Sequence, residues 1–301
     1  MKPKIGFVGV GAMGWPMAAN LIKAGFPVQI ADARAAQASK FAAEVGGKVA
    51  ASQRALGEAS DVVITMLPTS KIVRSVLLGG DGAGEGVAAG LRPGAIVIDM
   101  SSGVPTETAA IAERLAAMRV AMLDAPVSGG VRKAVTGELA IMVGGDGKVA
   151  LAADPVLRAM GKSVIRAGAI GSGQAMKALN NLVSAGGFLI AIEALLVGKR
   201  FGLDPAVMVD ILNASTGMNN STQVKFKQFV LSGSYGSGFA LDLMVKDIGI
   251  ALDVAKDLEV DTPFAALCRS IWSAAQADLG AGHDHTELAK YAAKTAGVNL
   301  G

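Results

Sequence analysis

The stretch GFVGVGAMGWPMAANL, residues 6–21, decides the fold of the first half of this chain. Its glycines follow the spacing G-x-G-x-x-G, after a short apolar run and before an alanine-rich segment. In that setting the first glycine makes the turn, the second lets the backbone approach a pyrophosphate, and the third lets a helix meet the strand. The helix N-terminus then stabilises the phosphate charge. We therefore predict a dinucleotide-binding turn formed by Gly9, Gly11, Ala12, Met13 and Gly14.

An acidic residue supports this interpretation. Such turns are followed, about 20 residues further on, by an acid at the end of the second strand. The stretch VQIADAR, residues 28–34, places Asp32 there. Its carboxylate would bind a ribose 2′-hydroxyl and repel a 2′-phosphate, so NAD is favoured as cofactor. Arg34 can receive a 2′-phosphate, which keeps NADP possible. Trp15 is bulky for its place after the last glycine, which predicts a tighter cleft at the pyrophosphate end of the cofactor.

Two patterns divide the rest of the chain. Up to about residue 167, β-branched runs alternate mostly with alanine-rich stretches such as residues 15–24 and 107–118, which predicts a mainly parallel, doubly wound sheet. The runs are KIGFVGV, PVQIA, DVVITML, GAIVIDM, VAMLDAP, LAIMVGG and KSVIRAG. After Gly173 the periodicity is helical, over residues 174–201, 204–214, 221–231, 241–258, 262–279 and 285–297. We predict a Rossmann-type α/β domain at residues 1–165 and an all-α substrate and dimerisation domain at 166–301, joined by a long helix.

Composition excludes several other classes of protein. Hydrophobic residues make up 51% of the 301 residues and charged residues 18%, which indicates a folded chain. The net charge is only +3 and the basic residues are scattered, so we expect no nucleic-acid partner. The apolar stretch 182–198 contains Glu193 and is short for a membrane span, so a buried helix is expected. Cys268 is the single cysteine and cannot form an internal disulfide. We expect a soluble, cytoplasmic protein.

Two segments carry groups suited to binding a substrate. In DAPVSGG, residues 124–130, a strand ends in a loop that leaves backbone N–H groups and one hydroxyl to bind a ligand. In GSGQAMKALNN, residues 171–181, Lys177 and Asn181 are one helical turn apart and share a face. The surrounding helix is almost entirely apolar, and burial favours the neutral amine that can act as a general base.

Three further features each allow two interpretations. Lys246 pairs with Asp242 by i,i+4 spacing or has a role in the site. The stretch STGMNNSTQVKFKQFV, residues 215–230, forms either a polar pocket wall or a helix cap. As a cap, it would precede a helix that begins at Asn220 or Ser221. As a wall, its candidate residues are Met218, Asn219, Asn220 and Lys225. His283 and His285 either bind zinc or belong to a capping loop. With no third ligand cluster in the sequence, we expect no metal.

These segments, in order, resemble the signature segments of the β-hydroxyacid dehydrogenase family, which includes 3-hydroxyisobutyrate dehydrogenases and tartronate semialdehyde reductases. The resemblance covers GFVGVGAMGWPMAANL, DAPVSGG, GSGQAMKALNN and KDIGIA, and so nearly the whole chain. It implies that Lys177 is the general acid/base, that Asn181 orients the substrate, and that Lys246 lies beside the nicotinamide. It further implies substrate binding by Ser128, Gly129 and Gly130, and cofactor contacts from Leu67, Pro68 and Ser102.

The expected reaction follows from these assignments. Consecutive N–H groups at a glycine turn form an anion-binding nest, and Ser128 adds a hydroxyl, so the loop can hold a carboxylate. Hydride would then pass between the nicotinamide and a small β-hydroxyacid or its semialdehyde, with Lys177 exchanging the hydroxyl proton. Two alternatives remain: a reductase of a ketone, aldehyde or imine without a carboxylate, and a non-catalytic dinucleotide sensor or scaffold. Ser128–Gly130 argue against the first and Lys177 against the second. The apolar helices predict a homodimer or homotetramer.

Overall fold

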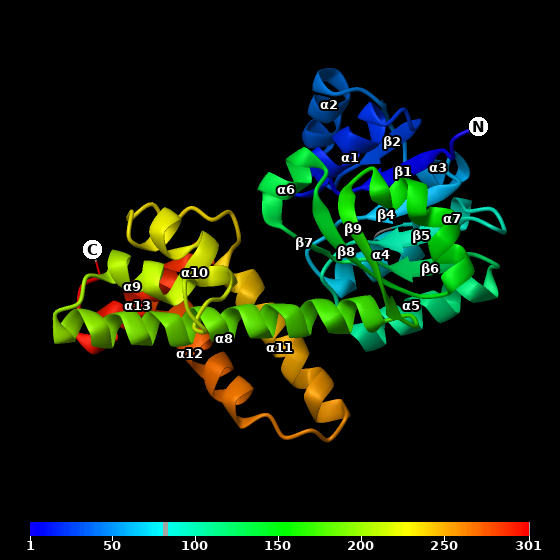
Figure 1. Cartoon of the computed structure of the whole chain (residues 1–301). Helices are drawn as coiled ribbons and strands as arrows, with labels where there is room; N and C mark the ends of the chain where they lie inside the picture. The colour runs from blue at the N-terminus through cyan, green and yellow to red at the C-terminus, as the bar shows by residue number, and fades with distance from the viewer. Residues whose placement is uncertain (81–83, 301) are drawn as a thin grey trace. The chain divides into compact units, whose positions relative to one another are not determined.

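The computed structural model of the chain describes residues 1–80 and 84–300 and shows two compact units (Figure 1). Unit 1 comprises Met1–Lys177 and unit 2 Ala178–Gly301. The division falls inside helix α8 (Ser172–Phe201), which is one continuous helix. It lies later than the predicted boundary at 165/166, because strand β9 (Gly161–Gly168) still belongs to the sheet.

Unit 1 is built on a nine-stranded sheet in the order β3-β2-β1-β4-β5-β6-β8-β7, with β9 paired to β8. All pairings from β3 to β6 are parallel, whereas β8 runs antiparallel to β6 and β7. The remaining strands are β1 (Ile5–Val8), β2 (Val28–Ala31), β3 (Lys48–Val49), β4 (Val62–Thr65), β5 (Ile96–Asp99), β6 (Ala121–Asp124), β7 (Val127–Ser128) and β8 (Leu139–Gly144). All seven predicted runs are strands. The sequence did not reveal β3 and β7, because two residues show no periodicity.

Helices bury both faces of this sheet in separate cores. One core contains Phe7, Met17 and Phe41, and the other contains Leu56 and Leu115. Burial on both faces explains why the parallel strands read as continuous apolar runs rather than as alternating ones. The helices are α1 (Gly14–Lys23), α2 (Ala35–Glu44), α3 (Gln53–Glu58), α4 (Ser70–Leu78), α5 (Pro105–Ala117), α6 (Gly130–Thr136) and α7 (Gly147–Arg158), with a 3-10 turn at Val87–Gly90.

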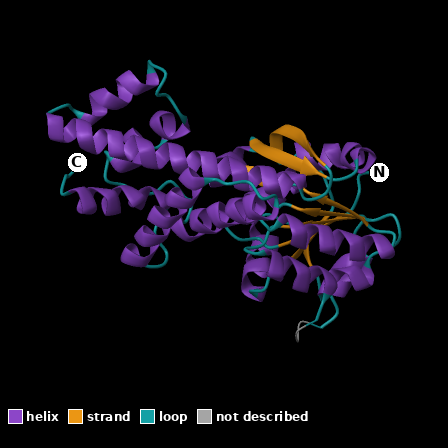
Figure 2. Ribbon diagram, turned by 90° about the horizontal axis from the view of Figure 1, so that it is seen from below, coloured by secondary structure: helices purple, strands orange, loops and turns teal. Residues whose placement is uncertain are grey.

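Unit 2 consists of helices, as Figure 2 shows by colour. They are the C-terminal part of α8, α9 (Pro205–Asn213), α10 (Asn220–Val224), α11 (Leu241–Asp257), α12 (Pro263–Leu279) and α13 (Leu288–Ala296). The predicted helix 221–231 is divided into α10 and a π-helical turn at Phe226–Val230. Asp204 caps α9 by accepting hydrogen bonds from the N–H groups of Ala206 and Val207, as its position before Pro205 predicts.

The core of unit 2 surrounds Phe188, Phe226 and Trp272. Cys268 lies in this core, where burial raises the pKa of its thiol to about 11. Helix α8 is long and apolar enough to cross a membrane by length and composition. More than half of its most apolar window is nevertheless buried inside the protein, as is typical of the core helix of a soluble protein.

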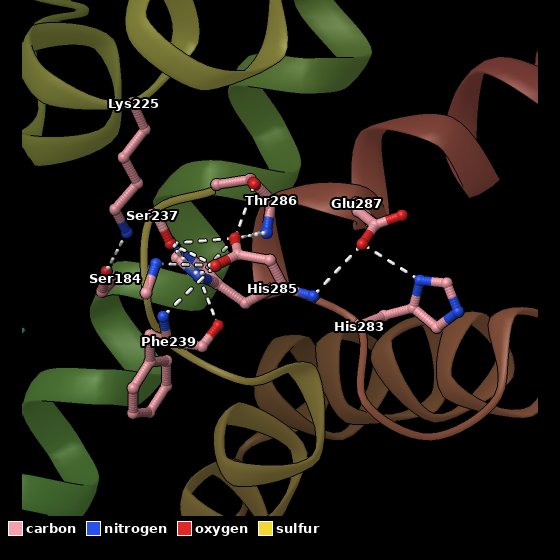
Figure 3. Close-up of polar contacts among 10 residues, drawn as sticks. Ser184, Lys225, Ser237, Phe239, His283, His285, Thr286 and Glu287 are labelled. Carbon is pink, nitrogen blue, oxygen red and sulfur yellow. Dashed lines mark hydrogen bonds and ion pairs between the residues drawn. The ribbon is translucent and has the colours of Figure 1, made fainter. Parts of the chain in front are cut away.

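Both histidines belong to the loop before α13 (Figure 3). Asp284 and Glu287 form a capping box at the 3-10 turn His285–Glu287, and His283 Nδ1 lies 3.0 Å from Glu287 Oε1. His285 is buried, with Nδ1 3.0 Å from Ser237 Oγ. Its ring packs among the aromatic rings of Phe188, Phe239 and Trp272. The capping interpretation is therefore the one observed, and in the described part of the chain no group of three ligating side chains could hold a metal.

His285 makes unit 2 sensitive to acid. Burial lowers the pKa of this imidazole below its ordinary value of 6.5. Below pH 6.5 this histidine therefore binds a proton in the unfolded chain but not in the folded chain. The free energy of unfolding then falls as pH falls, by at most about 1.4 kcal/mol per pH unit. Urea titrations between pH 7.5 and 5.0 should show this slope in the fluorescence of Trp272, in a Trp15→Phe background.

The His285→Phe variant should reduce that slope, because a phenyl ring keeps the aromatic packing but binds no proton. The matched control is His283→Gln, which removes the less buried histidine of the same loop and should leave the slope unchanged. Equal slopes in wild type and His285→Phe would show that another group is responsible.

Candidate active site

The glycine turn between β1 and α1 has the shape that a dinucleotide needs. Gly9 has a φ of +97°, and a Cβ there would lie 2.4 Å from the carbonyl oxygen of Met66. A Cβ on Gly14 would lie 1.8 Å from the carbonyl oxygen of Gly9. A Cβ on Gly11, by contrast, would meet no heavy atom within 4 Å. The outer glycines are thus required by close packing, while the middle one leaves space beside the backbone for a phosphate group.

Asp32 ties this turn to the end of β2. Its Oδ2 accepts a hydrogen bond of 2.9 Å from the N–H of Val10, and its Oδ1 accepts one of 2.9 Å from the N–H of Arg34. The exposed guanidinium of Arg34 lies 3.5 Å from Oδ1. A carboxylate oxygen has more than one acceptor site, so these bonds are compatible with a further bond to a ribose hydroxyl. The structure places Asp32 beside the glycine turn, and its contact with a ribose stays a prediction.

Trp15 packs within unit 1. Its ring contacts Phe41 of α2 edge to face, with the ring centroids 4.9 Å apart. The ammonium of Lys40 lies 6.0 Å from the centroid of the same ring. The bulky residue after the last glycine therefore helps to attach α2 to α1.

The predicted cofactor contacts after β4 and β5 lie at one edge of the sheet, because these strands are parallel neighbours and β1 is the next strand. Leu67 N–H donates to Ser101 Oγ over 2.9 Å. Pro68 is exposed and Ser102 half-buried in the adjoining turns. Their contacts with a cofactor stay predictions.

The buried carboxylate of Asp99, at the end of β5, holds this edge of the sheet together by hydrogen bonds. Its Oδ1 accepts hydrogen bonds from Thr65 Oγ1 at 2.8 Å and from Ser101 N–H at 3.1 Å. Burial raises the pKa of the Asp99 carboxyl to about 6, although these bonds oppose the shift. The carboxylate thus holds the turn after β5 in place from inside the protein.

Asp124 fixes the beginning of α8. Its Oδ1 accepts a hydrogen bond from Gly171 N–H and its Oδ2 accepts one from Gln174 N–H, both of 2.8 Å. Burial raises the pKa of this carboxyl, against the effect of the N–H donors. The Gln174 side chain in turn accepts from Gly103 N–H at 2.8 Å and donates to the carbonyl of Ser101 at 3.0 Å. One glutamine thus joins α8 to the turn after β5, a role that the sequence did not predict.

The loop predicted to bind a carboxylate follows β6. Ser128 is half-buried at the end of β7, which pairs with β8, while Gly129 and Gly130 are exposed. These two glycines have φ values of +132° and +67°, which side-chain-bearing residues rarely adopt. Positive φ values of this kind are compatible with the anion-binding nest that the sequence predicts, and carboxylate binding by this loop stays a prediction.

Lys177 and Asn181 share one face of α8, as predicted. Lys177 is only 8% exposed, and Asn181 is 5% exposed. Within unit 2, Asn181 Nδ2 donates to Asp247 Oδ2 over 2.5 Å, and Lys246 Nζ lies 3.3 Å from Asp247 Oδ1. Asp247, 1% exposed, therefore connects two of the predicted site residues. Its role depends on Asn181, 66 positions away, and the only local signal in the sequence is its place directly after Lys246.

Asn219, the first of the two asparagines after α9, forms a helix cap. Asn219 Oδ1 accepts hydrogen bonds from the N–H groups of Ser221 and Thr222, at 2.8 and 3.1 Å, and α10 begins at Asn220. Asn219 Nδ2 donates to the carbonyl of Gly187. The capping interpretation is therefore correct for Asn219. The assignment of Met218 and Asn220 to a pocket wall stays a prediction.

The glycine turn, the acid at the end of β2 and the parallel sheet are the features of a dinucleotide-binding domain of Rossmann type. Comparison with known proteins agrees. Residues 4–170 match the family described as the NAD binding domain of 6-phosphogluconate dehydrogenase. Residues 171–292 match that described as NAD-binding of NADP-dependent 3-hydroxyisobutyrate dehydrogenase.

Full-length relatives extend this agreement. The 3-hydroxyisobutyrate dehydrogenase of Pseudomonas aeruginosa is 41% identical over 283 residues, covering 91% of this chain and 93% of the relative. The 2-(hydroxymethyl)glutarate dehydrogenase of Eubacterium barkeri is 37% identical over 281 residues, covering 93% and 91%. The structure of Mycobacterium tuberculosis 3-hydroxyisobutyrate dehydrogenase with L-serine superposes with a TM-score of 0.88 at 33% identity, covering 97% of this chain and 99% of that one. The chain belongs to the β-hydroxyacid dehydrogenase family, and it is an NAD(P)-dependent oxidoreductase.

Proposed function

We propose that the protein interconverts a small β-hydroxyacid and its semialdehyde, with NAD as the preferred cofactor. The observation that carries the proposal is the placement of Lys177: a buried lysine on a helix whose first turn is held by Asp124 and Gln174. The names of the relatives support the substrate class, since they include dehydrogenases of 3-hydroxyisobutyrate, 2-(hydroxymethyl)glutarate and L-threonate.

The residues have distinct tasks in this reaction. The backbone N–H groups of Gly129 and Gly130, with the Ser128 hydroxyl, bind the substrate carboxylate. Lys177, as the neutral amine, accepts the hydroxyl proton in the oxidation, and as the ammonium it donates that proton in the reduction. Asn181, whose amide is held by its hydrogen bond to Asp247, orients the substrate hydroxyl.

The glycine turn would hold the cofactor, which would supply the redox chemistry. When bound, the nicotinamide accepts hydride in the oxidation and gives it in the reduction. Asp32, fixed by the N–H groups of Val10 and Arg34, favours the 2′-hydroxyl of NAD over the 2′-phosphate of NADP. Arg34 lies beside it, and so NADP is retained as a weaker alternative.

The enzyme works, we propose, as a soluble cytoplasmic homodimer or homotetramer. Several large apolar side chains of unit 2 are strongly exposed, and contiguous exposed apolar surface is typical of an interface. They come from α8, α9 and α12: Val183, Val197, Phe201, Val207, Ile211, Phe264 and Leu267.

The test is the absorbance of reduced nicotinamide after the protein is mixed with NAD or NADP and a panel of acids. We expect 3-hydroxyacids to be oxidised, and NAD to give the larger kcat/KM. Matched alcohols without a carboxylate should react at least about 100-fold more slowly, because they cannot use the anion-binding loop. Equal rates with and without the carboxylate would favour the reductase alternative. Tight NADH binding without turnover of any compound would favour the sensor.

A further inference from the structure

Asn20 of α1 joins two elements of the proposed site by a hydrogen bond. Its Nδ2 donates to the carbonyl oxygen of Ala134 in α6 over 2.7 Å, although the two residues are 114 positions apart in the chain. The two helices lie side by side within unit 1 (Figure 1). Helix α1 follows the glycine turn, and α6 begins at Gly130. The bond therefore joins the element that would bind the cofactor to the element that would bind the substrate carboxylate.

Helix α6 needs support from outside because it is short. It spans Gly130–Thr136, about two turns, and helices of that length are marginal without tertiary contacts. Ala134 lies in its last turn, where carbonyl groups lack regular partners within the helix. The N–H of Gly137, the left-handed residue that ends the helix, reaches this carbonyl at 3.3 Å. The amide of Asn20 makes the shorter bond, and it ties the end of α6 to another helix.

The hydrogen bond adds direction to the apolar packing between the two helices. Ala134 is fully buried in the same core as Met17 and Leu21 of α1. Apolar contacts of this kind are non-directional, whereas a hydrogen bond requires a narrow range of distance and angle. Along α6, Ala134 lies about 6 Å from Gly130. Because a helix is stiff over so short a distance, fixing its last turn also fixes its first residue.

We infer that Asn20 is a positioning residue for substrate binding: by anchoring α6 to α1, it holds the carboxylate loop Ser128–Gly130 at a fixed place relative to the glycine turn. The inference rests on the proposed function, and it adds the residue that sets the spacing of the two binding elements. The pairing of β7 with β8 anchors the loop at Ser128. Gly129 and Gly130 have no side chains that could anchor its other end, so that end depends on α6.

The test is the steady-state kinetics of Asn20→Leu, which keeps the branched shape of the side chain but removes the donor. KM for 3-hydroxyisobutyrate should rise about tenfold, the usual effect of a lost hydrogen bond to a buried acceptor. The value of kcat should stay within about twofold of wild type, because the carboxylate is bound equally in the ground state and in the transition state. The affinity for NADH should also stay within about twofold, because the glycine turn keeps its own contacts.

The matched control is Ser60→Ala. It removes another side-chain hydrogen bond to a helix carbonyl of unit 1, that of Leu56 at 2.6 Å, just before β4 and so at the opposite edge of the sheet from the glycine turn. This variant should lower the thermal transition without raising KM. An unchanged KM in Asn20→Leu, or an equal rise in Ser60→Ala, would overturn the inference. If Asn20→Leu does not fold, Asn20→Asp tests the same bond, because a carboxylate of the same shape can only accept, and KM should again rise.

A binding measurement separates this inference from the proposed function. Calorimetry on the full chain with NADH should show isobutyrate, which has the carboxylate but no hydroxyl to oxidise, binding about tenfold more weakly to Asn20→Leu than to wild type. If no acid is oxidised but this difference is found, the role of Asn20 stands and the proposed reaction fails. If hydroxyacids are oxidised but isobutyrate binds equally well to both proteins, the reaction stands and the role of Asn20 fails.

Discussion

Replacing Lys177 by methionine is expected to lower kcat for hydroxyacid oxidation about 10²- to 10⁴-fold, the range in which a general acid or base contributes. Methionine keeps the length and apolar stem of the side chain, so the buried position stays filled. The affinity for NADH should remain within about twofold of wild type, because the glycine turn and Asp32 do not involve this residue. Stopped-flow absorbance gives kcat, and fluorescence titration gives the NADH affinity.

The pH profile separates a chemical role from a structural one. In the wild type the rate of oxidation should rise with pH as the amine of Lys177 loses its proton, and the variant should lose this limb. Lys199→Met, an exposed substitution in the last turn of the same helix, is the control and should behave as wild type. A Lys177→Met enzyme that kept the wild-type rate and pH profile would remove this residue from the mechanism.

A methyl group added at Gly14 is expected to prevent the dinucleotide-binding turn from forming. The new Cβ would lie 1.8 Å from the carbonyl oxygen of Gly9, and backbone on both sides cannot yield cheaply. We expect Gly14→Ala to destabilise unit 1 by about 3 kcal/mol or more. Calorimetry should show its thermal transition lowered, and NADH binding should be lost.

The matched variant is Gly11→Ala, whose Cβ would meet no protein atom within 4 Å. It should melt like wild type but bind NADH at least about tenfold more weakly, because the methyl group occupies the space assigned to the pyrophosphate. A Gly11→Ala protein with full NADH affinity would contradict that placement. A stable Gly14→Ala protein would show that α1 can shift away from β1.

Local patterns explain why so much of the fold could be predicted from the sequence. Strands such as β4 and β5 are buried on both faces and therefore read as unbroken apolar runs. The start of α9 is indicated by Asp204 at the N-cap and Pro205 at the first helical position. The π-turn could not be predicted, because residues 221–231 keep a helical pattern of apolar residues through the change of hydrogen bonding. β3 and β7 were too short to show any pattern.

The same distinction holds for the site. The roles of Asp32 and Lys177 could be predicted because they depend on local spacing. Asp32 lies about 20 residues after the glycine turn, and Lys177 lies one helical turn before Asn181. The roles of Asp247 and Gln174 depend on partners far away in the chain. Asp247 binds Asn181, 66 positions away, and Gln174 binds the carbonyl of Ser101, 73 positions away. Folding brings such pairs together through packing of the whole unit, and no local pattern in one sequence records it.

The two hydrogen bonds from Gly171 and Gln174 to Asp124 determine more than the first residue of α8. They also set its rotational phase, because a helix held at its first turn has only one orientation for every later side chain. Each residue turns an α-helix by about 100°. A single residue inserted between positions 174 and 177 would thus swing Lys177 and everything beyond it to another side of the helix. The enzyme would lose its activity although every one of its side chains would still be present.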